Sequence, residues 1–149
     1  MRVLLQRVTT ASVAISGKSV GSIRRGLLLL VGVSAQDTLQ AADYLVQKIA
    51  KLRIFEDADG KTNLSCQEVS AQLLVVSQFT LYAQWKKGNR PGFSAAAPPD
   101  KAEVLFDYFV NQCKQLFPTV QTGRFDTAMQ IELVNDGPFT LFLDSDRKE

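Results

Sequence analysis

The sequence predicts an α+β fold: a single small domain in which a mainly antiparallel or mixed β-sheet packs with two main helices. A chain of 149 residues is a usual length for one domain. Most apolar runs are short and are separated by turn residues, whereas two longer segments carry apolar residues at helical spacing. No repeat and no shift in composition marks a boundary, so we expect residues 1–149 to form one domain.

The first part of the chain predicts three strands. Residues 2–14 alternate roughly between apolar and polar side chains, and the phase slips near Arg7, which indicates a strand with a bulge. A turn at residues 16–18 and a short return strand follow. Residues 26–33, GLLLLVGV, are almost wholly apolar, which is typical of a buried strand.

Two segments predict helices. The first is expected to begin at Asp37 and Thr38, and the second to begin with Asp100 as its cap and to end at Pro118. Each repeats apolar residues with the period of an amphipathic helix. The sets are Leu39, Ala42, Leu45, Ile49 and Leu52 in the first, and Val104, Leu105, Tyr108, Phe109, Cys113 and Leu116 in the second.

The remaining segments complete the sheet. Residues 56–63 contain Asp-Gly and predict a hairpin loop. Residues 71–82 are rich in branched and aromatic side chains and predict a central strand, which a polar loop at 83–100 follows. Residues 119–125 are interpreted as another strand or loop.

The composition excludes several kinds of site. The chain has no histidine, which removes Ser-His-Asp and Cys-His nucleophile systems and the commonest general base. Its two cysteines, Cys66 and Cys113, are far apart and are interpreted as idle thiols. We therefore expect no metal and no cofactor. A net charge of +2 is too weak to predict nucleic-acid binding by itself.

The sequence also predicts where the protein works. No apolar run has the length of a membrane span, and the N-terminus lacks the pattern of a signal peptide. We expect a cytoplasmic protein with no membrane partner.

The segment SQFTL, residues 77–81, is the first candidate for function. Three side chains that can form hydrogen bonds follow a hydrophobic run. In a strand, Gln78 and Thr80 would share one face and point together into a pocket. The ordinary alternative is that Thr80 is a good strand residue and Gln78 faces solvent.

The second candidate is a loop that interleaves aromatic and basic side chains. They are Tyr82, Trp85 and Phe93, and Lys86, Lys87 and Arg90. Stacking surfaces beside positive charge are typical of sites for single-stranded nucleic acid. The alternative is a solvated loop whose aromatic side chains pack back onto the core.

The third candidate is NDGPFT, residues 135–140, which interrupts a segment that is strand-like on both sides. Proline cannot donate to a sheet ladder and Asp-Gly is a strong turn signal, so a hairpin turn is one interpretation. The other is a Gly-Pro unit whose backbone carbonyls face a ligand. The local pattern leaves both open.

Taken together and in this order, SQFTL and NDGPFT resemble the D-aminoacyl-tRNA deacylase family. The resemblance extends from MRVLLQRVTTASV through VGSIRRGLLLLVGVSAQDT and SQFTLYAQWKKGNRPGFSAAAP to MQIELVNDGPFTLFLD. It implies a hydrolase that cleaves the ester bond of D-aminoacyl-tRNA and Gly-tRNA and so proofreads translation. It also implies a homodimer with its active site at the subunit interface.

The resemblance implies four groups of site residues. The catalytic segment is Ser77, Gln78, Phe79 and Thr80, and the chirality filter is Gly137 and Pro138. The supporting residues are Arg7, Asn135 and Met129, and the tRNA-binding set is Lys86, Lys87 and Arg90. The Gly-Pro unit, which is cis in the family, would enter the partner's pocket and present two carbonyl oxygens. The side chain of an L-amino acid would clash with them, whereas a D-amino acid or glycine would be accepted.

Since histidine is absent, the implied mechanism relies on the substrate. The backbone N–H groups of Phe79 and Thr80 would stabilise the oxyanion, and the 2′-hydroxyl of the tRNA would assist. An esterase with Thr80 as nucleophile is a competing interpretation, although the sequence shows no base to activate it. A nucleic-acid-binding module without hydrolytic activity is the other alternative.

One segment departs from the family's pattern. The family usually has a GxFGAxM-like stretch, whereas residues 123–129 read GRFDTAM, with Asp126 and Thr127 in place of two small residues. If this loop lines the mouth of the pocket, the charge of Asp126 would alter substrate entry.

Overall fold

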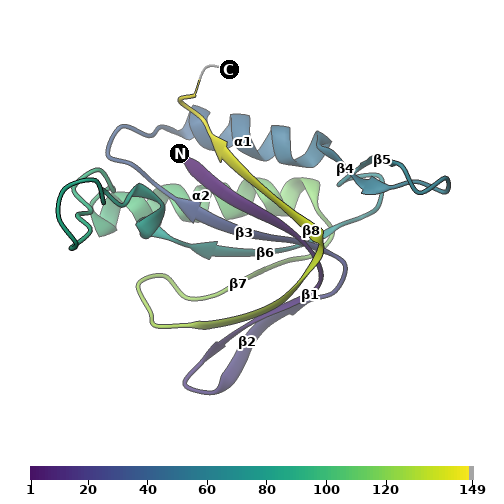
Figure 1. The fold of residues 1–149 in the computed structure, drawn as a ribbon, viewed down its shortest axis with the longest axis horizontal. Coiled ribbons are helices and arrows are strands. Elements are labelled where there is room, and N and C mark those ends of the chain that lie inside the picture. The colour runs from purple at the N-terminus through teal and green to yellow at the C-terminus, as the bar shows by residue number, and fades with distance from the viewer. Residues whose placement is uncertain (148–149) are drawn as a thin grey trace.

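The computed structural model describes residues 1–147 and contains a six-stranded mixed sheet, a separate two-stranded sheet and two α-helices (Figure 1). This architecture confirms the predicted α+β class. The strands are β1 (Arg2–Ile15), β2 (Lys18–Ile23), β3 (Gly26–Gly32), β4 (Arg53–Glu56), β5 (Thr62–Ser65), β6 (Gln72–Ser77), β7 (Val120–Thr122) and β8 (Gln130–Asp144). The helices are α1 (Leu39–Lys51), the short 3₁₀ helix η1 (Phe79–Tyr82) and α2 (Pro99–Leu116).

The large sheet has the order β2-β1-β3-β6-β7, and β8 pairs with β1. β1 is antiparallel to β2, β3 and β8, whereas β3 and β6 are parallel, as are β6 and β7. β4 and β5 form the predicted hairpin around residues 56–63. β8 has no partner other than β1 among the described residues, so its second side is an open edge of the sheet.

The central strands are buried on both faces. Leu27 and Leu29 of β3 lie in the core between the sheet and the helices, whereas Leu28 lies in a second core on the opposite face. In β6, Leu73 and Leu74 divide between the two cores in the same way. A strand with both faces buried needs apolar residues at every position, which explains the unbroken run that the sequence shows.

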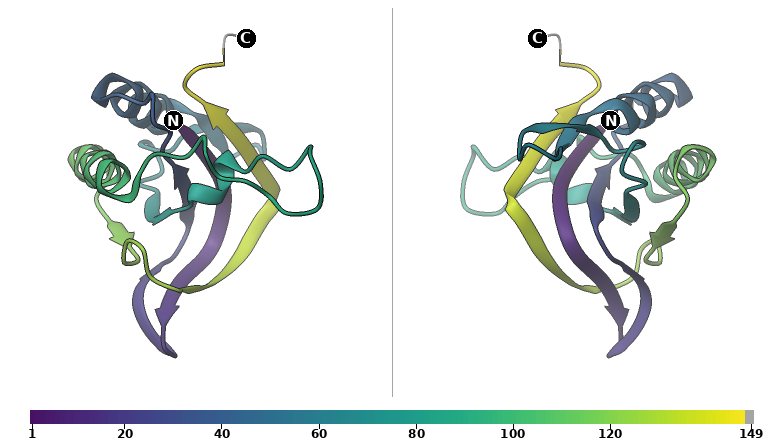
Figure 2. Two further views of the ribbon diagram at one scale, coloured as in Figure 1. Left: turned by 90° about the vertical axis from the view of Figure 1, so that its left-hand side faces the viewer. Right: turned by 90° about the vertical axis from the view of Figure 1, so that its right-hand side faces the viewer.

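Both helices lie on one side of the curved sheet, and the loop between η1 and α2 projects from the body (Figure 2). α1 begins close to the predicted position, with Thr38 as its N-cap. The prediction for α2 is wrong in two details. Pro98 is the N-cap and Asp100 lies in the first turn, and Val104 is 67% exposed.

The buried stripe of α2 is shifted from the predicted one. It consists of Ala102, Leu105, Phe106, Phe109, Val110 and Cys113. The apolar residues of this helix cover more than one stripe, so sequence spacing alone allows either choice. Because α2 packs against α1 and the sheet, the face that carries Phe106 is the one that is buried. Within the described residues, neither helix has the combination of length and hydrophobicity that crossing a bilayer requires.

Candidate active site

The SQFTL segment is not a continuous strand. β6 ends at Ser77, and the chain turns at Gln78 into η1, so the predicted strand over residues 71–82 is wrong in its last part. The last ladder bond runs from the Gln78 amide to the Val31 carbonyl (2.8 Å), because β3 itself ends at Gly32. Gln78 and Thr80 nevertheless meet: the Gln78 side-chain amide donates a hydrogen bond to the Thr80 hydroxyl.

Two backbone N–H groups in this segment are unengaged. Leu81 donates to the Gln78 carbonyl and Ala83 to the Thr80 carbonyl. Among the described residues, the amides of Phe79 and Thr80 donate to no acceptor. The first N–H groups of a helix have no partner within it, so they are available to an oxygen atom from outside.

Gly32 allows η1 to pack closely on the end of β3. A Cβ atom at this position would lie 3.0 Å from the Gln78 carbonyl oxygen, 3.1 Å from Leu81 Cβ and 3.3 Å from the Tyr82 ring. A side chain of any size would therefore push η1 away from β3. The lack of a side chain at Gly32 sets the position of the two unengaged amides.

A cavity of about 720 Å³ adjoins the catalytic segment. Ser77, Gln78 and Phe79 line it together with aromatic and proline residues from the following loop and the start of α2. Phe79 is 55% exposed and meets Phe93 edge to face, with 5.0 Å between ring centroids. The wall is largely apolar and carries a few polar side chains, among them Ser77 and Gln78, as in many small-molecule sites.

The segment that departs from the family's pattern lines this cavity. All five residues from Phe125 to Met129 contribute to its wall, which includes the exposed Asp126 and Thr127. The charge of Asp126 therefore belongs to the cavity wall, and its effect on substrate entry stays a prediction. Met129, predicted as a supporting residue, also lies in this wall.

NDGPFT is an excursion within one strand and not a hairpin turn. β8 continues from Gln130 to Asp144, and its register with β1 passes from Val8↔Asn135 to Gln6↔Thr140. Between these two pairs, β1 advances by two residues and β8 by five, so the extra residues of β8 bulge out opposite Arg7. This is where the sequence predicted a bulge. The Gly137–Pro138 peptide bond is cis, and Gly137 has φ +146°, a conformation that suits glycine.

Arg7 and Asn135 hold this excursion from two sides. Arg7 is 6% exposed, and its guanidinium donates to the carbonyls of Asp136 (2.9 Å) and Ile54 (2.6 Å) and lies over the Phe139 ring at 4.9 Å. The Asn135 side chain accepts from the Phe139 amide (2.7 Å) and donates to Thr140 Oγ1 (2.9 Å). Both side chains thereby brace the backbone on which Gly137 and Pro138 lie exposed.

The Gly-Pro unit does not line the cavity of its own chain. The wall around Ser77 and Gln78 contains no residue between Ile131 and the end of the described chain. The structure therefore places Ser77, Gln78 and Phe79 of the predicted catalytic segment in one cavity wall with Met129, whereas Thr80 is not part of that wall. Arg7, Asn135, Gly137 and Pro138 lie together elsewhere.

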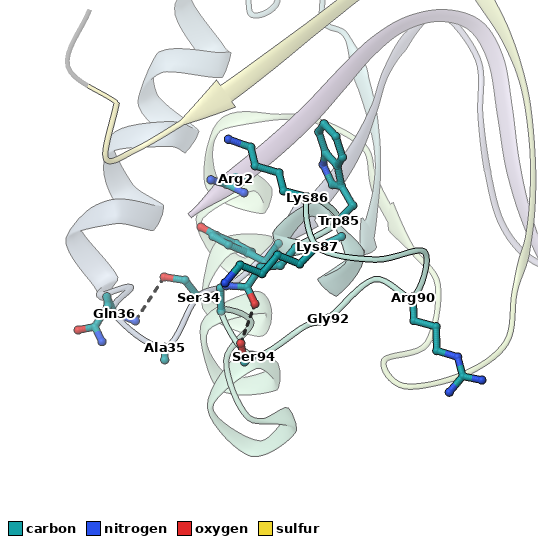
Figure 3. Close-up of a pocket in the computed structure, with 14 residues that line it drawn as sticks. Arg2, Ser34, Ala35, Gln36, Trp85, Lys86, Lys87, Arg90, Gly92 and Ser94 are labelled. Carbon is teal, nitrogen blue, oxygen red and sulfur yellow. Dashed lines mark hydrogen bonds between the residues drawn. The ribbon is translucent and has the colours of Figure 1, made fainter.

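The basic loop lines a second cavity, of about 910 Å³ (Figure 3). Lys86, Lys87 and Arg90 lie here and not around the catalytic segment. The loop is closed at its base by a two-way backbone pairing of Gln84 with Gly92 (2.7 and 2.8 Å). Ser94 Oγ also donates to Gln84 Oε1 at 2.8 Å.

Sequence patterns did not single out Arg2 or Gly32. Arg2 Nη1 donates to the Leu81 carbonyl (2.9 Å), Nε donates to Asp144 (2.9 Å), and the guanidinium lies 4.4 Å from the centre of the Tyr82 ring. An arginine at the start of a strand gives no signal of these distant partners. Gly32 interrupts the apolar run of residues 26–33 near its end, and a glycine inside a strand pattern is a local signal of a close backbone approach.

Both cysteines are buried, and burial raises the pKa of the Cys66 and Cys113 thiols to about 12. They are therefore protonated at neutral pH and are not nucleophiles. Their interpretation as idle thiols is consistent with this.

Comparisons with known proteins agree on one family. A family model described as D-Tyr-tRNA(Tyr) deacylase matches residues 4–144. A D-aminoacyl-tRNA deacylase of Thermosipho africanus is 52% identical over 145 residues, which is 97% of each chain. One of Thermotoga petrophila is 48% identical over 147 residues, 99% of each.

Solved structures show the same fold. One named "c-Myc DNA Unwinding Element Binding Protein" superposes with a TM-score of 0.93 at 38% identity and covers 99% of this chain and 100% of its own. Another, named "Structural Analysis of a probable eukaryotic D-amino acid tRNA deacylase", has a TM-score of 0.84 over 95% of this chain and 97% of its own. At 18% identity the second shows the fold alone.

The fold and the match over nearly the whole chain define a hydrolase of the deacylase class. The chain belongs to the D-Tyr-tRNA(Tyr) deacylase family, whose curated relatives are named D-aminoacyl-tRNA deacylases. The resemblance drawn from SQFTL and NDGPFT is thereby confirmed.

Proposed function

We propose that the chain hydrolyses the ester bond of D-aminoacyl-tRNA, and of Gly-tRNA, and releases the free amino acid and tRNA as a proofreading step in the cytoplasm. The observation that carries the proposal is a pair of unengaged amides, one at Phe79, which lines the 720 Å³ cavity, and one at the next residue, Thr80. Family membership supplies the substrate class.

In the proposed reaction, water attacks the ester carbonyl and the C–O bond to the ribose 3′-oxygen breaks. The developing oxyanion accepts hydrogen bonds from the two amides, an arrangement that stabilises the transition state more than the ground state. The proton lost by water ends on the leaving 3′-oxygen, and the neighbouring 2′-hydroxyl of the ribose assists. The protein needs no side-chain base in this scheme, which fits a chain without histidine.

The chirality filter would come from a second copy of the chain. Gly137 and Pro138 are exposed and do not line the cavity of their own chain, which supports a contribution to a neighbouring one. The open edge of β8 and its exposed Val134 (56%) and Phe142 (46%) support a homodimer. In that dimer the carbonyl oxygens of Gly137 and Pro138 would clash with the side chain of an L-amino acid. The α-hydrogen of a D-amino acid or of glycine would fit in the same place.

Two other functions remain candidates. The basic loop supports a nucleic-acid-binding module without hydrolytic activity, and the 38% identical solved structure is named for binding a DNA element. An esterase with Thr80 as its nucleophile is less well supported, because the side chain that is hydrogen-bonded to the hydroxyl is the Gln78 amide, which donates to it and is no base.

The test is a deacylation time course on D-Tyr-tRNA, L-Tyr-tRNA and Gly-tRNA side by side. We expect loss of the D-ester and the glycyl ester while the L-ester survives. Hydrolysis of both D- and L-esters would support the esterase activity but contradict the chirality filter. Loss of no ester, with tRNA still bound, would favour the binding module.

The dimer is tested separately by light scattering. We expect twice the chain mass of 16.4 kDa. A monomer that still spares the L-ester would contradict a filter supplied by the partner.

A further inference from the structure

We propose that the cavity at the basic loop is a separate subsite for the unpaired nucleotides that precede the terminal adenosine of the substrate, with a base stacked on Trp85. We call it the basic cavity; Arg2, Tyr82, Trp85, Lys86, Lys87 and Arg90 are among the residues that line it. The inference rests on the proposed function, since a tRNA 3′ end is the single-stranded ligand that a deacylase must hold.

The charge of the basic cavity suits a phosphate backbone. Among residues 1–147, four basic side chains and no acidic one line it. Arg2 is paired with Asp144, whereas Lys86, Lys87 and Arg90 form no ion pair within residues 1–147. Unpaired cations around a hollow attract an anionic chain and release its counterions when it binds.

Trp85 provides the stacking surface. It is 70% exposed, the largest exposed fraction among the large hydrophobic side chains of the described chain. In Figure 3, Trp85 and Lys86 lie on the same side of the loop near Arg2, whereas Arg90 extends away from them. An aromatic face beside a cation is the combination that holds unpaired bases and their phosphates without base selectivity.

The basic cavity is coupled to the catalytic segment through η1. Phe79, at the start of η1, lines the catalytic cavity, and Tyr82, at its end, lines the basic one. Arg2 fixes this end of η1 by its bond to the Leu81 carbonyl and its stacking on Tyr82. A strand with its ester at Phe79 and Thr80 can therefore continue along η1 into the basic cavity.

The first experiment uses intrinsic fluorescence. Trp85 is the single tryptophan of the chain, so its emission reports on this cavity alone. The wild-type protein is titrated with the RNA 5′-ACCA-3′, which carries no amino acid, and with adenosine. We expect quenching by the tetranucleotide that is saturable and weakens with salt, and no quenching by adenosine. Equal quenching by both ligands, or by neither, would overturn the proposal.

The second experiment compares two substrates, D-Tyr-tRNA and the ester of D-tyrosine with adenosine. Trp85→Leu, and the double change of Lys86→Gln with Lys87→Gln, should each lower kcat/KM on the tRNA about tenfold, as expected for one lost stacking or phosphate contact. On the adenosine ester, which cannot reach the basic cavity, both should match the wild type. An unchanged ratio between the two substrates would overturn the proposal.

A matched control exists on α1. Tyr44 is also an exposed aromatic (54%), and Lys48 Nζ lies 5.9 Å from its ring centre, but neither residue lines the basic cavity. Tyr44→Leu and Lys48→Gln should leave both substrates unaffected. If they lower the tRNA rate as much as the Trp85 change, the effect is one of general surface charge and the proposal fails.

The two proposals fail in distinguishable ways. If the wild type hydrolyses neither ester, the proposed activity is wrong, and the titration alone then decides whether the basic cavity holds single-stranded RNA. If Trp85→Leu does not fold, the double lysine change carries the comparison, because both side chains are exposed.

Discussion

Thr80 tests the proposed mechanism at the scale of one side chain. Its hydroxyl accepts a hydrogen bond from Gln78, and its backbone amide is unengaged. If the amide is the active group, Thr80→Ala should keep at least about a tenth of kcat, whereas loss of a true nucleophile costs roughly 10⁴-fold or more. Single-turnover hydrolysis of D-Tyr-tRNA measures the difference. A folded, tRNA-binding Thr80→Ala protein without turnover would establish the nucleophile.

Phe79 allows the amide itself to be removed. Proline is tolerated at the first position of a helix, and it lacks the N–H group. Phe79→Leu and Phe79→Pro both delete the ring, but only the second deletes the donor. We expect kcat of the proline variant to be about 100-fold below that of the leucine variant, the usual effect of losing one oxyanion donor. Equal rates would exclude the Phe79 amide from catalysis.

At the scale of elements, the proposed mechanism requires that η1 keep its position against β3. Gly32→Ala introduces a Cβ 3.0 Å from the Gln78 carbonyl oxygen, so η1 must shift by a few tenths of an ångström or more. A small misplacement of positioned groups can lower a rate by about 100-fold. We expect a loss of kcat of that order on D-Tyr-tRNA, with a circular dichroism spectrum like that of the wild type. Wild-type kcat would show that the position of η1 is not critical.

At the scale of the whole molecule, Arg2 and Asp144 join the beginning of β1 to the end of β8 (2.9 Å). Burial opposes ionisation of Asp144, but hydrogen bonds from the Asp146 amide and Arg2 outweigh it, so the pKa of Asp144 lies below its usual 3.8. A lowered pKa in the folded state stabilises the protein above pH 3.8, and this contribution disappears as the pH falls through the folded value.

Asp144→Asn should therefore lower the free energy of unfolding at pH 7 by about 0.5–1 kcal/mol, the range of a partly exposed ion pair. The two proteins should converge in stability near pH 2. Urea denaturation at both values of pH measures this. An equal difference at pH 2 and pH 7 would assign the effect to packing and not to charge.

The sequence predicted an element correctly where its local pattern is compatible with a single secondary structure. The apolar run of β3, the hairpin at residues 56–63 and the two helices followed from periodicity and turn residues. The end of β6 could not be predicted in this way, because SQFTL has strand-forming residues and the strand stops where its partner β3 stops. The continuous course of β8 depends on pairing with β1, more than 110 residues earlier, which no local signal encodes.

The candidate site was predicted in the same uneven way. The motifs predicted a set of site residues, but they did not predict that Lys86, Lys87 and Arg90 line a cavity of their own. The wall of that cavity includes Arg2, Gln84 and Gly92, which come together only through contacts in the folded chain.

The two unengaged amides of η1 also bear on how such a chain can change over generations. An N–H group belongs to every residue type except proline, so most single replacements at Phe79 or Thr80 leave it in place. A site of this kind tolerates drift in its own side chains and is vulnerable instead to changes that move its backbone, such as those at Gly32. Selection for the activity would then act most strongly on Gly32, a position that does not contact the substrate in the proposed mechanism.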